Sequence, residues 1–353
     1  MNSPSRKIPL TGLTRKELEI LLAEHGIDAG YAARLLYWIY RRKIRSFAEI
    51  DDIPGRVKDA LTVFSDPGIT TPFSSVESGD GSVKYLFSNG EGKYYESVYI
   101  PDGTRKTLCI SVQSGCRMGC TFCATGKYGW HGNLTSGEIT GQVTGIPFEV
   151  THVVFMGMGE PCDNAAEVIK ACTILTSEWG LAKGRANITI STVGMLPGLQ
   201  QLLDSTDCNI TLSLHSPFPE ERAAIVPAEK RWPAGMLTDL IKNHKSRRGR
   251  RFSVAYVMIE GVNDSDAHLM ELKKMLAGTA IRVNLLPYHP LPGDTYRSSD
   301  AERIHWFKHS LVTSGISASI RRSRGSDVYA ACGMLATTLS GKKLTENKTN
   351  IIP

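Results

Sequence analysis

Three closely spaced cysteines carry the clearest chemical signal in this sequence. Cys116, Cys120 and Cys123 lie in "SGCRMGCTFCATGKYGW", separated by three and then two residues. Structural zinc sites close with four ligands, usually as separated pairs of cysteines, and no second pair occurs here. Iron–sulfur cubanes are held by thiolates, and three thiolates leave one iron of a cubane open to another ligand. We therefore expect these cysteines to hold one 4Fe-4S cluster rather than zinc.

An open iron in a reducible cubane can start radical chemistry. The iron can bind the amino-acid end of S-adenosylmethionine, and one electron passed to the sulfonium then releases a 5′-deoxyadenosyl radical. The C-x3-C-x2-C pattern, with Phe122 before the last cysteine, resembles the signature of the radical SAM superfamily. This resemblance implies S-adenosylmethionine as a cofactor and an external one-electron reductant as a partner.

Length and composition limit the setting of this chemistry. The chain has 353 residues, 41% of them hydrophobic and 22% charged, which suits one large catalytic domain and a smaller appendage. The N-terminus lacks an apolar signal segment, and no apolar run is long enough to span a bilayer. We therefore expect a cytoplasmic monomer, in which eight cysteines favour metal or thiol chemistry over disulfides. The net charge of +6 suits a polyanionic partner but does not identify one.

The first of the elements that must position the cysteines is helical, over residues 13–64. Thr14 is a suitable N-cap, with Glu17 three residues later, which is the pattern of a capping box. We expect a small helical accessory domain over residues 1–70. Its basic edge can contact RNA or simply complement a helix C-terminus. This edge consists of Arg41, Arg42, Lys43 and Arg45.

Strands follow. The period-two pattern over residues 82–100 predicts a β-hairpin turning at Asn89-Gly90, within an extension over residues 71–105. Six apolar runs then alternate with helical sequence across residues 106–335, which predicts an α/β fold: a partial (βα)6-type barrel. The chemistry of such a barrel lies on the loops after its strands. Residues 336–353 are expected to be a disordered tail. The six runs are "TLCISV", "HVVFM", "NITIS", "NITLSL", "FSVAYVMI" and "IRVNLL".

Small and polar residues follow three of these runs. "FMGMGEP" contains Gly157, Gly159 and Glu160, a carboxylate that can accept from a ligand amine. "ISTVG" and "SLHSP" place serines and a histidine after the next two strands. Each motif alone is equally consistent with an ordinary glycine-rich turn or a buried structural residue. Together they would face one cavity and fit a bound nucleoside.

The C-terminal sequence narrows the resemblance to one family. "RRSRGSDVYAACGML", with "TLCISVQSGC" and "MGMGEP" upstream, resembles the RlmN/Cfr family of radical SAM RNA methyltransferases, from about Glu96 to Leu335. The resemblance implies methylation of an adenine at carbon 2 or carbon 8 in 23S ribosomal RNA, and in some members of a transfer RNA. An adenine C–H carbon is not nucleophilic, so a thiolate must accept the methyl group first.

The resemblance also implies roles for individual residues. Cys332 would carry the methyl group, Cys109 would resolve the covalent link to RNA, and Glu96 would accept a proton. Without the family, Cys332 and Cys109 would be interpreted as buried core residues and Glu96 as an exposed strand residue. The implied S-adenosylmethionine contacts are Gly159, Glu160, Ser191, Ser213, Leu214, His215 and His289. His289 replaces the family's usual asparagine. Met334 stands where the family usually has a glutamine after the "CG" of Cys332 and Gly333.

Two basic runs support an RNA substrate, although a solvated basic face is the alternative. A target base would have to be unstacked to reach a buried cofactor. "SLHSP" favours carbon 8 and "ESVYIP" favours carbon 2, and of the two we favour carbon 2. Two other functions stay open: a radical SAM enzyme of another reaction type, or a non-catalytic iron–sulfur RNA-binding protein. The basic residues are Lys245, Arg247, Arg248, Arg250 and Arg251, then Arg321, Arg322 and Arg324.

Overall fold

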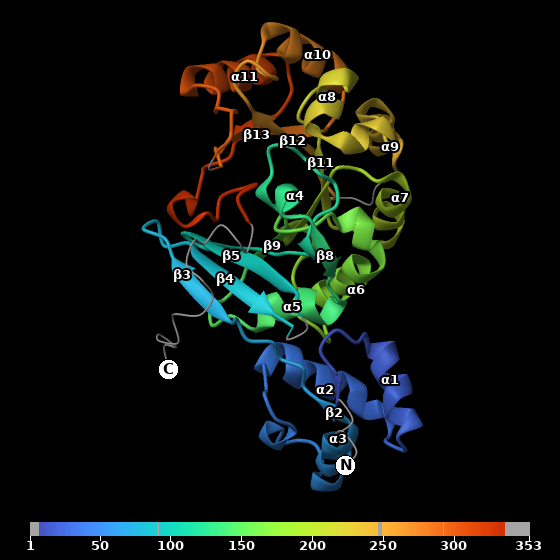
Figure 1. The fold of residues 1–353 in the computed structure, drawn as a ribbon. Coiled ribbons are helices and arrows are strands. Elements are labelled where there is room, and N and C mark those ends of the chain that lie inside the picture. Colours follow the sequence, from blue (N-terminus) through green and yellow to red (C-terminus); the bar gives the residue numbers. More distant parts are fainter. Residues whose placement is uncertain (1–6, 90–91, 246–248, 292, 336–353) are drawn as a thin grey trace.

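A single ten-stranded sheet forms the centre of the molecule (Figure 1). The structure is a computed structural model that describes residues 7–89, 92–245, 249–291 and 293–335. The strand order is β14-β13-β12-β11-β10-β9-β6-β5-β4-β3, and the seven strands from β6 to β14 run parallel to one another. These are β6 (Arg105–Cys109), β9 (His152–Phe155), β10 (Ile188–Thr192), β11 (Asn209–Ser213), β12 (Phe252–Met258), β13 (Arg282–Pro287) and β14 (Ala318–Ile320).

The parallel strands confirm the predicted α/β class and the partial barrel. All six apolar runs form strands of this sheet. Side chains from β6, β10, β11, β12, β13 and β14 line one shared cavity, so the sheet curves around it. The barrel is open because β14 and β3 are the two edges of the sheet. The sequence did not predict β14, because "ASI" is too short and too polar to show a strand pattern.

Helices connect the parallel strands and lie along the outside of the sheet (Figure 1). Their apolar positions recur at helical spacing: in α7, Leu199, Leu202 and Leu203 are buried. None of the described helices is long and apolar enough to cross a membrane. The helices are α5 (Ser136–Thr144), α6 (Ala165–Thr176), α7 (Leu196–Ser205), α8 (Pro219–Ile225), α9 (Ala234–Asn243), α10 (Asp266–Leu276) and α11 (Ala301–Thr313).

The N-terminal segment is helical and packs tightly against the barrel, and its division from the barrel at residue 70 stays a prediction. Its helix α1 (Arg15–Glu24) begins with the expected capping box between Thr14 and Glu17. The other helices are α2 (Ala32–Tyr37), extended by a π-helical turn, and α3 (Gly55–Phe64), and the strands β1 (Ile8–Pro9) and β2 (Ser65–Asp66) pair in parallel. A Cβ on Gly12 would lie 2.4 Å from the backbone nitrogen of Gly137 in α5, so only glycine permits this close contact.

The predicted hairpin continues the barrel sheet rather than standing apart from it. β4 (Val83–Ser88) pairs antiparallel with β5 (Tyr94–Asp102), and β5 pairs with β6. β3 (Ser74–Glu77) completes the extension. Gly90 of the expected turn and the expected disordered tail, residues 336–353, lie outside the described residues.

Candidate active site

The three clustered cysteines lie on a loop whose shape is fixed by its backbone. The loop follows β7 (Gln113–Gly115), which pairs with β8 (Trp130–Asn133), and it leads into α4 (Ala124–Tyr128). Gly115 has φ +76°, and a Cβ there would lie 1.7 Å from the carbonyl oxygen of Gly129. The same carbonyl accepts a hydrogen bond of 2.8 Å from the N–H of Cys116. Side-chain size and chirality therefore make glycine necessary where the loop begins.

The cysteine side chains are close enough to influence one another's protonation. Burial raises the pKa of Cys116 to about 12 and that of Cys120 well above its usual value, and in both cases the charge of Cys123 raises the pKa further. Metal binding removes such protons, because the ligand is the thiolate. Within the described ranges, no three His, Cys, Asp or Glu side chains are arranged to hold one metal ion. A cubane takes each thiolate on a different iron, and three thiols on one loop fit that group.

Glu160 joins the loops that follow β9 and β10. It is 3% exposed, and Oε1 accepts from the N–H of Cys162 at 2.9 Å and from the hydroxyl of Thr192. Oε2 accepts from the N–H of Val193 at 2.9 Å. The carboxylate, expected from its sequence to accept from a ligand amine, already accepts from protein donors. Burial raises the pKa of Glu160 against these hydrogen bonds, and its oxygens still have lone pairs for a further donor.

Gly159 is required by the protein's own packing. It has φ +97°, and a Cβ there would lie 2.5 Å from the Cβ of Gln113. Gly159 therefore lets the backbone approach the strand before the cysteine loop closely. It brings the turn after β9 against the loop of the cluster.

Ser191, Ser213, Leu214 and His215 lie at or after the ends of β10 and β11, as expected. The hydroxyls of Ser191 and Ser213 are 3.5 Å apart. Leu214 is fully buried, and His215 has φ +61°, in the left-handed region that non-glycine residues rarely adopt. Burial, with a smaller contribution from Arg222, lowers the pKa of His215 to about 3, so the imidazole is neutral.

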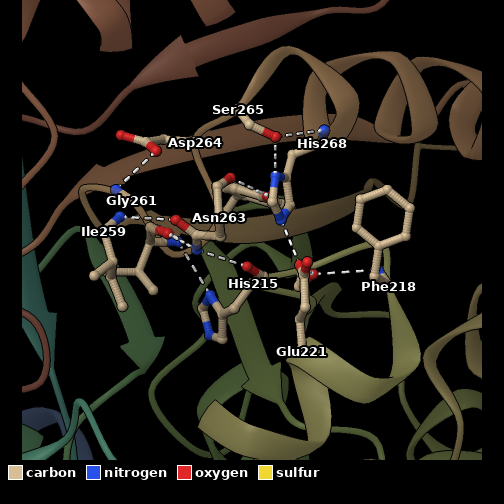
Figure 2. Close-up of polar contacts among 12 residues, drawn as sticks. His215, Phe218, Glu221, Ile259, Gly261, Asn263, Asp264, Ser265 and His268 are labelled. Carbon is tan, nitrogen blue, oxygen red and sulfur yellow. Dashed lines mark hydrogen bonds and ion pairs between the residues drawn. The ribbon is translucent and has the colours of Figure 1, made fainter.

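Asn263, which the sequence analysis did not single out, holds His215 in this conformation (Figure 2). Its amide donates to the carbonyl oxygens of His215 at 2.7 Å and Val257 at 2.6 Å, and its Oδ1 accepts from Ile259. The N–H of Val257 donates to His215 Nδ1 at 3.1 Å, which places the ring proton on Nε2. Hydrogen bonds from Ser265 to His268 and from His268 to Glu221 also connect the segment after β12 with the segment after β11. Only the tertiary structure brings these segments together, because 48 residues separate His215 from Asn263.

Arg222 is a second positioning residue that sequence reasoning missed. It is fully buried in α8, and its guanidinium donates to the carbonyls of Leu214 at 2.9 Å, Ser213 at 2.9 Å and Val193 at 3.0 Å. It also forms a buried ion pair with Glu229. Burial lowers the pKa of Arg222, and Glu229 opposes that shift. In sequence, "PEERAAI" suggests only a solvated helix, so nothing local reveals this role.

Cys109 and Cys332 line the same cavity, which has a volume of about 450 Å³. Cys109 is half-buried at the end of β6, and Cys332 is exposed, so the core interpretation without the family does not hold for Cys332. Burial raises the pKa of Cys109 to about 12, and the charge of Cys332 raises it further. Cys332 keeps solvent-accessible surface, but the protein atoms packed around its thiol partly desolvate it and raise its pKa. Arg321 opposes this rise, and Cys123 adds to it. Cys332 therefore lies within electrostatic reach of both the cluster loop and Cys109.

Both the cluster loop and the β-extension hold the segment that carries Cys332. The N–H of Ala124 donates to the carbonyl of Gly333 at 2.7 Å, one residue beyond Cys332. At the other end, Asp327 accepts from the hydroxyl of Ser78 at 2.6 Å and from the N–H of Gly79 at 3.0 Å. The turn between β3 and β4 thus anchors the Cys332 segment.

Glu96 is buried away from the cavity of Cys332, whereas His289 lines it. Glu96 is 2% exposed, so the interpretation of an exposed strand residue is wrong. Its carboxylate lies 3.5 Å from the ammonium of Lys84 and is not part of the cavity wall around Cys332. His289 does line that cavity, and its Nε2 is 2.9 Å from the hydroxyl of Ser323. Burial lowers the pKa of His289, which favours its neutral form.

The basic runs divide into structural residues and residues of the cavity. Arg251 lines the cavity, as do Arg321, Arg322 and Arg324. Arg250 instead donates to the carbonyl of Leu203 at 2.9 Å. Arg247 and Arg248 lie outside the described residues.

Comparison with known proteins gives one consistent picture. Residues 110–272 match the Radical SAM superfamily. A "Probable dual-specificity RNA methyltransferase RlmN" of Bacteroides thetaiotaomicron is 41% identical over 333 residues, 94% of this chain and 96% of that protein. A protein of the same name from Porphyromonas gingivalis is 42% identical over 336 residues, 94% of this chain and 95% of that protein. The crystal structure of a radical SAM methyltransferase from Sphaerobacter thermophilus superposes with a TM-score of 0.86 at 36% identity, covering 93% of this chain and 98% of that one.

Proposed function

The chain belongs to the RlmN family of radical SAM RNA methyltransferases, and on that premise we propose that it methylates an adenine ring carbon through a methyl group carried on Cys332. The observation that carries the proposal is the position of Cys332. It shares a cavity with Cys109 and lies within electrostatic reach of Cys123 of the cluster loop. A cysteine that carries the methyl group must lie near the radical source, which removes hydrogen from that methyl group, and near the thiol that later resolves the link to RNA.

The cofactors of this family are one 4Fe-4S cluster and S-adenosylmethionine, and we assign the cluster to Cys116, Cys120 and Cys123. When bound, the cluster and S-adenosylmethionine would together supply a methyl group, one-electron reduction and a radical that removes hydrogen. The chain's own contribution is orientation. Glu160 has lone pairs left to accept from the ammonium of the cofactor, and neutral His215 can donate from Nε2.

Cys332 must be a thiolate to accept a methyl group. Its pKa is raised by burial, and the nearby guanidinium of Arg321 opposes that rise. After a carbon–carbon bond to the ring has formed, the thiolate of Cys109 attacks the sulfur of Cys332. The carbon–sulfur bond breaks toward carbon, which takes up a proton to become the new methyl group, and the unpaired electron left by the radical addition passes to the external one-electron carrier. The two sulfurs are left as a disulfide that an external reductant opens with two electrons. We assign Glu96, beside Lys84, as acceptor of the ring proton by family resemblance.

The substrate assignment is carbon 2 of an adenine in 23S ribosomal RNA, with a transfer RNA adenine as a second substrate. The words "dual-specificity" in the names of the relatives support two RNA substrates. We place a monomeric enzyme in the cytoplasm, where both RNAs and a one-electron reductant are present.

Mass analysis of methylated RNA after anaerobic reconstitution tests this function. The wild-type protein should form 5′-deoxyadenosine and 2-methyladenosine, and Cys332→Ala should form no methylated product. Cys208→Ala, which removes a buried thiol elsewhere, should keep methylation as a matched control. Methylation that survives in Cys332→Ala would point to another reaction type. A reconstituted protein that forms no 5′-deoxyadenosine would point to a non-catalytic RNA-binding role.

A further inference from the structure

The cavity that holds Cys109 and Cys332 has a second, chemically different end. The cavity follows the inner face of the sheet, and Cys109 lies at the C-terminal end of β6. Arg105 is the first residue of β6, Arg282 is the first residue of β13, and Arg251 directly precedes β12. Because these strands are parallel, the three arginines all lie at the N-terminal ends of the strands, at the end of the cavity away from Cys109.

The cavity wall carries a large excess of positive charge. Among the residues that line it, Asp102 is the one carboxylate, and it pairs with Arg324 at 3.5 Å. For the other five arginines, no carboxylate of the described residues comes within 4.0 Å. The six arginines of the wall are Arg105, Arg251, Arg282, Arg321, Arg322 and Arg324.

These guanidinium groups lie close enough to repel one another. Burial lowers the pKa of Arg105, the charges of Arg321 and Arg251 also lower it, and the charge of Asp102 opposes this with a smaller effect. The groups have few protein partners: Arg105 Nε donates to the hydroxyl of Thr107 at 3.2 Å, and Arg251 Nη2 donates to the carbonyl of Ala186 at 3.4 Å. Solvated basic faces usually intersperse acids among the bases. A concave cluster of six arginines with one carboxylate among them would be stabilised by a bound anion.

Arg321 connects the two ends of the cavity. Its charge lowers the pKa values of both Cys109 and Cys332, and it also acts on Arg105. An anion bound between Arg321 and Arg105 therefore lies beside the two thiols. A cavity of about 450 Å³ falls in the size range of sites for one small ligand and excludes a duplex.

We propose that the arginine end of this cavity binds a backbone phosphodiester of the RNA, next to the nucleotide whose base reaches Cys332. The proposal rests on the proposed function only in taking RNA as the substrate. A base drawn out of its stack must bring its own flanking phosphate with it. The arginines would then fix how far the nucleotide enters, and the thiol end would select the reacting carbon.

A mutant cycle that combines arginine removal with phosphate neutralisation tests this site. The probe is a single-stranded RNA heptamer with one central adenosine among uridines, in which the phosphate beside the adenosine is intact or replaced by an uncharged methylphosphonate. Binding is measured on the anaerobic holoprotein by fluorescence anisotropy at several salt concentrations. The variants are Arg105→Gln, Arg282→Gln and, to keep the charge, Arg105→Lys. Lys274→Gln, which removes an exposed cation on α10, is the matched control.

Arg105→Gln and Arg282→Gln should each weaken binding of the intact heptamer about tenfold and reduce the salt slope by about 0.7. The methylphosphonate should weaken binding to the wild-type protein, Arg105→Lys and Lys274→Gln similarly, but should have little further effect on the two glutamine variants. Equal losses from the methylphosphonate in every protein would overturn the proposal. A second result would also overturn it: inorganic phosphate stabilises the wild-type fold but not the glutamine variants, while all of these proteins bind RNA equally. The site would then bind a small free anion. Because methyl transfer is not measured, failure of the methylation assay leaves this result interpretable.

Discussion

Replacing Arg222 by methionine should destabilise the protein more than any change to an exposed arginine. The guanidinium binds three carbonyl oxygens, at 2.9 to 3.0 Å, and the carboxylate of Glu229, and both partners of the ion pair are almost fully buried. Methionine preserves the length and apolar volume of the side chain but leaves Glu229 charged and unpaired by a cation. Glu229 would keep its hydrogen bond of 2.8 Å from the N–H of Ala234.

Breaking a buried ion pair by removing one partner lowers the free energy of unfolding by about 3–5 kcal/mol. For an m-value of about 3 kcal/mol per molar urea, the unfolding midpoint of the anaerobic holoprotein should fall by about 1 M or more. Arg185→Met is the matched control, because Arg185 pairs with Asp207 while its own side chain is 60% exposed. An exposed pair contributes about 0–1 kcal/mol, so that midpoint should move little.

The double variant Arg222→Met/Glu229→Gln separates the electrostatic cause from a packing defect. Removing both charges should recover part of the loss, because no buried charge is left unpaired. Affinity for S-adenosylmethionine should fall in both variants, since the carbonyls that Arg222 joins belong to the loops after β10 and β11. An unchanged unfolding midpoint in Arg222→Met would refute this account. So would a double variant whose loss of unfolding free energy equals the sum of the losses in Arg222→Met and Glu229→Gln.

Three further predictions concern the cluster loop, His215 and the segment that carries Cys332. Gly115→Ala should lose most of its bound iron, because the new Cβ would meet a carbonyl oxygen at 1.7 Å, whereas Gly119→Ala, with open space around it, should keep its iron at a backbone cost of about 1–2 kcal/mol. Because the pKa of His215 is lowered to about 3 from the ordinary 6.5, the unfolded chain binds the extra proton between these values. The free energy of unfolding should therefore fall by about 2 kcal/mol from about pH 8 to about pH 5, and an unchanged pH dependence in His215→Gln would contradict this. Asp327→Ala removes the hydrogen bonds to Ser78 and the next residue, so amide exchange of residues 321–335 should become about tenfold to a hundredfold faster, and unaltered exchange would show that the anchor has no effect.

Local patterns predicted the elements well because those patterns are physically local. The capping box of Thr14 and Glu17 and the apolar strands express backbone preferences within a few residues. Even the error at β14 has a local cause, since three residues cannot display an alternating pattern. The loop positions of Glu160 and His215 also followed from strand order alone, because parallel strands end at one edge of the sheet.

The burial and the interaction partners of individual side chains could not be predicted from the sequence, because they depend on segments far apart in the chain. Glu96 was interpreted as exposed from its strand position, yet it is buried, and Lys84 lies beside its carboxylate. Arg105 and Arg282 drew no attention in the sequence, since each is a lone cation at the start of a strand. They become one charged wall only when the sheet curves.

By itself, the sequence determined which potential ligands this protein carries: three thiols at fixed short spacing and a separate cysteine far along the chain, to which we assign the methyl group. Covalent spacing sets which ligands share a loop, and no folding is needed to see it. The tertiary structure alone decided which groups meet across that distance, placing Cys332 near both Cys109 and the cluster loop and gathering arginines in the wall of the same cavity. The physical reason is that desolvation and charge interactions depend on separation in space, which a curved sheet sets and sequence order does not.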